Sequence, residues 1–135
     1  MSGRSVPEAG AVVTHRRYVP YSDAHYAGNL VDGAYSMKLF GDVATEMCIV
    51  TDGDEGLFAS YADVQFREPV RAGDVLEVVC TLARVGTRSR TLELEVRVVA
   101  RGCPTAERPG GAEVLAEPLV ATTATGTVVV PPRAE

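Results

Sequence analysis

The sequence is poor in cysteine and histidine, and neither residue is arranged as a metal site or a disulfide framework requires. The 135 residues contain three cysteines, Cys48, Cys80 and Cys103, which are widely spaced and form no Cys-x-x-Cys pair. With only two histidines, His15 and His25, a zinc site is not expected. We therefore predict no metal, and we expect the cysteines to be reduced thiols that pack in the core.

Long apolar runs and an excess of positive charge are also missing. No apolar run approaches the ~18 residues that a membrane span needs. The first ten residues, MSGRSVPEAG, lack the apolar core of a signal peptide. With 13 basic and 18 acidic side chains the net charge is −5, which argues against a nucleic-acid partner. We expect a cytoplasmic protein with neither a membrane partner nor a nucleic-acid partner.

What the chain does contain is typical of one soluble globular domain. Hydrophobic residues make up 46% of the sequence and charged residues 23%. No internal repeat or linker divides the chain, so we predict one domain over residues 11–130. Residues 1–10 and 131–135 are expected to be flexible tails.

The hydrophobic pattern predicts strands joined by short turns, with one helix. In the fourth predicted strand Leu92, Leu94, Val96 and Val98 alternate with charged residues. This pattern predicts an α+β fold in which an antiparallel sheet packs on one helix. The expected strands are 11–19, 57–67, 75–85, the segment around 92–98 and 118–130, with a loop to about 29 and a helix over about 30–50.

The predicted helix has two different faces. A stripe of mostly small residues should face the sheet. The other side mixes Asp32, Asp42 and Glu46 with Tyr35, Leu39 and Val43, and such a mixed face suggests cover by a second subunit. The stripe consists of Leu30, Ala34, Met37, Gly41, Ala44 and Cys48.

A polar loop that runs into this helix is the best candidate for a site. Gly28 and Gly33 allow a backbone to approach a ligand closely. The start of a helix presents free N–H groups and positive partial charge. Asp42 and Glu46 are four positions apart on one face, so they form either a solvated acidic surface or a general base beside a carboxylate that holds a cation.

Four segments resemble the β-aminoacyl-CoA ammonia lyases. In order they are DAHYAGNLVDGA, LFGDVATE, TDGDEGLF and V-x-F-x-x-P-V-x-A-G-D at 64–74, within about residues 20–100. The resemblance implies the hot-dog fold, in which a five-stranded antiparallel sheet wraps one long helix. It also implies a homodimer with active sites at the subunit interface, assembled into a hexamer. The implied reaction removes ammonia reversibly from a β-aminoacyl-CoA, gives a 2-enoyl-CoA and needs no metal or redox cofactor.

The resemblance gives the loop and helix residues roles. The backbone near Gly33 would stabilise an enolate oxygen, with Gly28 allowing close approach. Asp42 or Glu46 would be the base, and the other carboxylate, with Asp32, would lie near the substrate ammonium. The sequence does not rank Asp42 against Glu46.

Roles are also expected for residues around the helix start and the two carboxylates. His25 has either a structural hydrogen bond or a part in thioester binding and proton transfer. Tyr26 is expected in packing or as a wall of the substrate site, and Asn29 forms a cap or turn beside the substrate. Basic residues in turns are expected to bind the phosphates of CoA. These CoA-binding candidates are Arg71, Arg88, Ser89 and Arg90.

Two alternatives of other kinds stay open. The pattern D-x-H-x-x-G-N-x-x-x-G also resembles hexameric acyl-CoA thioesterases of the same fold. Those enzymes usually carry a helix aspartate seven residues after the last glycine, where this chain has Phe40. A non-catalytic module that binds an acyl thioester would keep the pocket without needing the helix carboxylates.

Overall fold

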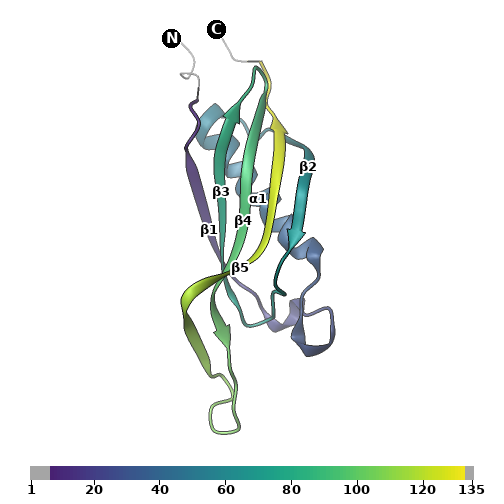
Figure 1. The fold of residues 1–135 in the computed structure, drawn as a ribbon, viewed down its shortest axis with the longest axis vertical. Coiled ribbons are helices and arrows are strands. Elements are labelled where there is room, and N and C mark those ends of the chain that lie inside the picture. The colour runs from purple at the N-terminus through teal and green to yellow at the C-terminus, as the bar shows by residue number, and fades with distance from the viewer. Residues whose placement is uncertain (1–6, 133–135) are drawn as a thin grey trace.

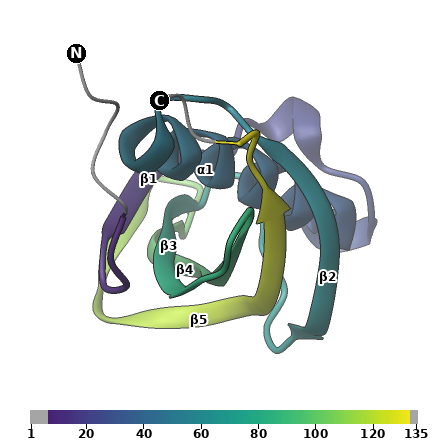
Figure 2. The same cartoon turned by 90° about the horizontal axis from the view of Figure 1, so that it is seen from above.

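The computed structural model describes residues 7–132 as a five-stranded antiparallel sheet curved around one long helix (Figures 1 and 2). This arrangement confirms the predicted fold class. Residues 1–6 and 133–135 of the two predicted tails lie outside the described residues. The elements in chain order are β1 (Val12–Tyr18), the short 3₁₀ turns η1 (Tyr21–Asp23) and η2 (Ala27–Asn29), α1 (Gly33–Asp52), β2 (Leu57–Phe66), β3 (Val75–Val85), β4 (Ser89–Gly102) and β5 (Ala112–Val129).

The strand order in the sheet is β1-β3-β4-β5-β2, so β1 and β2 form the two edges. The strand β5 begins at Ala112, earlier than the predicted start near 118, because its pairing with β4 continues as far as Gly102 opposite Ala112. The two strands form a long hairpin that projects from one end of the molecule in Figure 1. The edge strand β2 is paired only with β5 among the described residues.

Capping groups set the limits of α1. The Asp32 carboxylate accepts a hydrogen bond from the Tyr35 N–H at 3.2 Å, so the helix begins at Gly33 and not near residue 30. At the other end Gly53 has φ +69° and its N–H donates to the Ile49 carbonyl at 2.9 Å. The sequence segment TDGDEG therefore closes the helix and leads into β2.

The face of α1 that packs on the sheet differs from the predicted one. Leu39 and Val43 were expected on the side opposite the sheet, but both are buried in the core. Ala34, expected against the sheet, is exposed, and no atom lies within 4 Å of a Cβ built on Gly41. The larger apolar side chains determine which face is buried, because they remove more surface from water. The buried helix residues are Ser36, Leu39, Phe40, Val43, Ala44, Met47 and Cys48.

Gly126, near the end of β5, has no room for a side chain unless its neighbours shift. A Cβ there would lie 2.5 Å from Cζ of Phe58 and 3.0 Å from Cδ1 of Leu94. The Phe58 ring is itself stacked on Tyr61, with centroids 4.1 Å apart. We expect Gly126→Ala to lower the free energy of unfolding by about 1–3 kcal/mol, since overpacking forces neighbours to shift.

Urea unfolding at fixed protein concentration measures this loss. The matched control is Gly110→Ala in the β4–β5 loop, where a new Cβ meets no atom within 4 Å. The control should stay within about 0.5 kcal/mol of the original protein. Equal stability of the two variants would contradict the expected collision.

Candidate active site

The loop before α1 is held in one shape by its own backbone. The N–H groups of His25 and Tyr26 both donate to the Leu30 carbonyl, at 2.8 and 2.9 Å. Gly28 and Asn29 both have positive φ, at +77° and +60°, a region that glycine and asparagine enter most readily. The Asn29 carbonyl accepts the N–H of Ala72 at 2.8 Å. The predicted turn role of Asn29 is therefore confirmed, while the His25 and Tyr26 side chains are exposed and contact each other edge to face.

A buried aspartate fixes the turn that holds this loop. Asp74 is fully buried and accepts the Arg71 N–H at 2.8 Å. Its carboxylate also accepts two hydrogen bonds from Arg101, at 2.9 and 3.0 Å. Hydrogen bonding to Asp74 raises the pKa of the Arg101 guanidinium. The sequence showed only a turn at these residues, because Arg101 lies 27 positions away.

A hollow of about 370 Å³ opens at the start of α1. Gly33, the first helical residue, lines it, and the first N–H groups of a helix have no acceptor within the helix. A Cβ on Gly33 would lie 2.7 Å from the Phe66 ring, so glycine is needed for this close approach. The hollow is lined by Val31, Asp32, Gly33, Ser36, Phe66, Arg67, Glu68, Pro69, Val70 and Thr122.

The two helix carboxylates lie away from this hollow. The Asp42 and Glu46 side chains are 54% and 51% exposed in the single chain. Gly33 and Asp42 are nine residues apart, or roughly 14 Å along the helix axis. Within one chain the structure does not bring the predicted base and the helix start together.

Each carboxylate has a charged or polar neighbour. Nζ of Lys38 lies 3.7 Å from Asp42, one helical turn away. Oε1 of Glu46 lies 2.8 Å from Nε2 of His15 on β1. Asp42 and His15 also line a second hollow, of about 360 Å³, between β1 and α1. No local pattern could have revealed the His15–Glu46 pair, because its members are 31 positions apart.

An arginine and a tyrosine join β1 to the first turns of α1. The Arg17 Nε donates to the Tyr35 hydroxyl at 3.1 Å, and the guanidinium lies 5.6 Å from the ring centroid. Burial raises the pKa of the Tyr35 hydroxyl. Arg17 lines the same hollow as Asp42, so this contact shapes the wall near the carboxylate.

The candidate CoA-binding residues divide between the two ends of the helix. Arg71 has an exposed side chain and lies beside Leu30, near the start of α1. Arg88 and Ser89 lie at the turn before β4, near the far end of α1, where Arg88 donates to the Val130 carbonyl at 3.4 Å. The two ends of the helix are roughly 28 Å apart.

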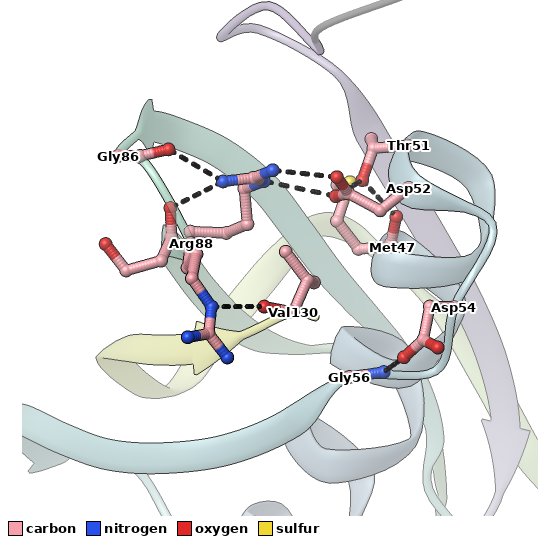
Figure 3. Close-up of polar contacts among 10 residues, drawn as sticks. Met47, Thr51, Asp52, Asp54, Gly56, Gly86, Arg88 and Val130 are labelled. Atoms are coloured by element: carbon pink, nitrogen blue, oxygen red, sulfur yellow. Dashed lines mark hydrogen bonds and ion pairs between the residues drawn. The ribbon is translucent and has the colours of Figure 1, made fainter. Parts of the chain in front are cut away.

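Arg90 is engaged in a buried ion pair. Its guanidinium donates to both oxygens of Asp52 at 2.7 and 3.1 Å, and the two side chains are 2% and 4% exposed. It also donates to the carbonyls of Gly86 and Ser89. In Figure 3 the dashed lines that end at the labelled Gly86 and Asp52 mark two of these contacts. These bonds give Arg90 a structural role at the end of α1, which the sequence did not show, so we leave it out of the proposed CoA site.

The three cysteines differ in their burial. Cys48 and Cys80 are free and buried, as predicted, whereas Cys103 is exposed and not in the core. Burial raises the pKa of the Cys48 thiol to about 11 and that of Cys80 to about 12, so both are protonated near neutral pH.

Within residues 7–132 no group of three or more His, Cys, Asp or Glu could hold a metal ion, and no helix is long and apolar enough to cross a membrane.

Known proteins resemble this chain in both sequence and fold. The thioesterase superfamily model matches residues 28–104. The 3-aminobutyryl-CoA ammonia lyase of Acetoanaerobium sticklandii is 49% identical over 111 residues, which are 81% of this chain and 86% of that protein. The chain belongs to the acyl-CoA ammonia lyase family. The resemblance found in the sequence is thereby confirmed.

Solved structures share the hot-dog fold of this chain. The β-alanyl-CoA:ammonia lyase from Clostridium propionicum is 34% identical, with a TM-score of 0.85 over 95% of this chain and 94% of that chain. The hexameric thioesterase from Yersinia pestis is 20% identical, with a TM-score of 0.70 over 90% of this chain and 88% of that chain. The second likeness shows a shared fold.

Proposed function

We propose that this chain catalyses the reversible elimination of ammonia from a β-aminoacyl-CoA to give a 2-enoyl-CoA. The observation that carries the proposal is the hollow at the start of α1, which combines a helix N-terminus with the carboxylates of Asp32 and Glu68. The names of the two ammonia lyases that resemble this chain support the same reaction.

The chemistry needs three kinds of group. A thioester carbonyl acidifies the protons on its α-carbon, and the enolate oxygen that forms is stabilised by N–H groups aimed at it. The helix start at Gly33 offers such groups. Carboxylates attract the substrate ammonium, and Asp32 and Glu68 supply them. A base then removes the α-proton, so the proposed reaction uses only protein groups and no metal or redox cofactor.

The base is proposed to come from a second copy of the chain. Asp42 and Glu46 are too far along α1 to reach the hollow of their own chain. The edge strand β2 exposes large apolar side chains, with Leu57 72% and Phe66 60% exposed. An exposed edge strand pairs readily with another strand. A symmetric dimer across β2 would set two helices side by side in opposite directions and bring each base toward the other helix's start.

The proposal extends to the CoA-binding residues, to the hexamer and to the location in the cell. Arg71 and the Arg88–Ser89 turn are the proposed contacts for the CoA phosphates, one of them supplied by the partner subunit. Three such dimers would form a hexamer, and the Yersinia pestis thioesterase of the same fold is described as hexameric. Free thiols fit a reducing compartment, so we keep the cytoplasm as the proposed location.

The reaction is tested by incubating the purified protein with ammonium and either crotonyl-CoA or acrylyl-CoA, followed by mass spectrometry. We expect a product that is heavier by one ammonia and is still a thioester. The yields from the two substrates begin to identify the acyl group. Free CoA without the adduct would indicate a thioesterase instead, and neither product would favour a binding module.

The structure gives a reason to prefer the lyase over the thioesterase. Phe40, at the position where hexameric thioesterases were expected to carry their aspartate, is fully buried in the core of this chain. No carboxylate is therefore available at that position for hydrolysis.

A further inference from the structure

Two buried hydroxyl groups line the hollow at the start of α1. Oγ of Ser36 lies 3.0 Å from Oγ1 of Thr122, and each residue is only 2% exposed. Ser36 belongs to α1 and Thr122 to β5, on the strand face that packs toward the helix. Both residues line the hollow together with Asp32, Gly33 and Glu68.

The mutual hydrogen bond uses only part of the bonding capacity of this pair. Two hydroxyls have two protons, and their mutual bond uses one of them. Each oxygen has its partner in the other, and no second hydrogen bond of either side chain is found within residues 7–132. A hydroxyl can donate one hydrogen bond and accept two, so one proton and several lone pairs of the pair stay available. The pair can therefore both donate and accept hydrogen bonds with a small polar group in the hollow.

We propose that the Ser36–Thr122 pair is the subsite for the amino group of the substrate and for the ammonia that leaves it. This inference rests on the proposed lyase activity. Ser36 is three residues after Gly33, so the two lie on one helix face about 5–6 Å apart. In a β-aminoacyl thioester the nitrogen is four bonds from the carbonyl oxygen. A carbonyl held at Gly33 thus places the nitrogen near the hydroxyl pair.

The hydrogen-bond donors and acceptors that remain on the pair match those of neutral ammonia. In the elimination the base takes a proton from Cα, and the electrons of that C–H bond form the double bond. The Cβ–N bond breaks and its electron pair stays on nitrogen, so the ammonium leaves as neutral ammonia with three N–H groups and one lone pair. The hydroxyl oxygens accept from the N–H groups, and the spare hydroxyl proton donates to the new lone pair. That last bond exists only after C–N cleavage begins, so it favours the transition state.

Steady-state kinetics of ammonia addition test the subsite. Rates are measured with crotonyl-CoA and ammonium for the original protein, Ser36→Ala and Thr122→Val. We expect the KM for ammonium to rise about tenfold in each variant, the effect of one hydrogen bond. The KM for crotonyl-CoA should stay within about twofold, because the thioester is held elsewhere. The double variant should lose little more than either single variant, since the two hydroxyls act as one unit.

Two further variants provide the controls. Thr122→Ser keeps the hydroxyl and should keep the original KM for ammonium. Thr125→Val makes the same substitution on β5 at a hydroxyl that donates to Glu93, outside the hollow, and should change neither KM. If Thr122→Val fails to fold, Ser36→Ala decides the result.

The outcomes separate this inference from the proposed function. Active variants with an unchanged KM for ammonium, or with both KM values raised equally, would overturn the subsite and leave the lyase intact. An original protein that forms no adduct with either enoyl-CoA would overturn both.

Discussion

D42N or E46Q should reduce the rate of ammonia elimination at least about a hundredfold in one of the two variants, the usual loss when a general base is removed. Both changes keep the shape of the side chain and remove its ability to accept the α-proton. Both side chains are about half exposed in the single chain, so the fold should be preserved. The oligomer should be preserved as well, because neither substitution changes the size of the side chain. The measurement is kcat at saturating substrate, with size-exclusion chromatography as the check on assembly.

Substituting the residue that contacts each carboxylate distinguishes which of the two carboxylates is the base. His15→Gln removes the imidazole that contacts Glu46, and Lys38→Met removes the ammonium next to Asp42. If Glu46 is the base, His15→Gln should change kcat and the pH profile, while Lys38→Met should change neither. If Asp42 is the base, the two effects should be reversed. Full activity in both D42N and E46Q would rule out the assignment of the base to this pair.

Mixing inactive variants tests whether the base comes from a second subunit. Gly33→Leu should block the hollow of its own chain, because even a Cβ there lies 2.7 Å from Phe66. A heterodimer of Gly33→Leu with the inactive carboxylate variant has one site in which both required parts are intact. Partial recovery of activity after mixing and reassembly is expected, whereas no recovery would indicate that each site is built from one chain.

The fold could be predicted because each of its elements is indicated by a pattern within a short stretch of sequence. The alternation from Leu92 to Val98 gave a strand, and the polar loop followed by an apolar stretch gave the helix. The buried face of the helix was predicted only in part: Ala44 and Cys48 are buried as expected, but Leu39 and Val43 are buried too. The predicted stripe was centred on the small residues. Packing is determined by the large side chains of Phe40 and Met47, which fill the space under the sheet.

The candidate site was predictable only in part. Gly28 and Gly33 were noticed because a glycine acts on the backbone at its own position. Asp32 was predicted as a residue of the helix face near the substrate, and its role as the helix cap was missed. The contacts Ser36–Thr122, His15–Glu46 and Arg101–Asp74 join residues 86, 31 and 27 positions apart. Such pairs form only when the sheet closes around the helix, so no pattern along the sequence indicates them.

The ion pair between Arg90 and Asp52 gives the largest expected effect on stability. Arg90→Met would leave the Asp52 carboxylate buried, 4% exposed, without its cation at the end of α1. The C-terminal end of a helix carries negative partial charge, which adds to the cost of an uncompensated carboxylate there. We expect the free energy of unfolding to fall by about 3–5 kcal/mol, the usual loss when one member of a buried pair is removed.

Urea unfolding followed by circular dichroism, at one fixed protein concentration, measures this loss. Replacing both members, as Arg90→Met with Asp52→Leu, should recover most of it, because no buried charge is then left alone. The matched control is Arg88→Met two residues away, where the exposed side chain makes one long hydrogen bond and the change should stay within about 0.5 kcal/mol. If Arg90 instead contacted CoA, Arg90→Met would raise the KM for the thioester and leave the stability equal to that of the Arg88 variant. The two measurements together therefore decide between a structural arginine and a phosphate-binding one.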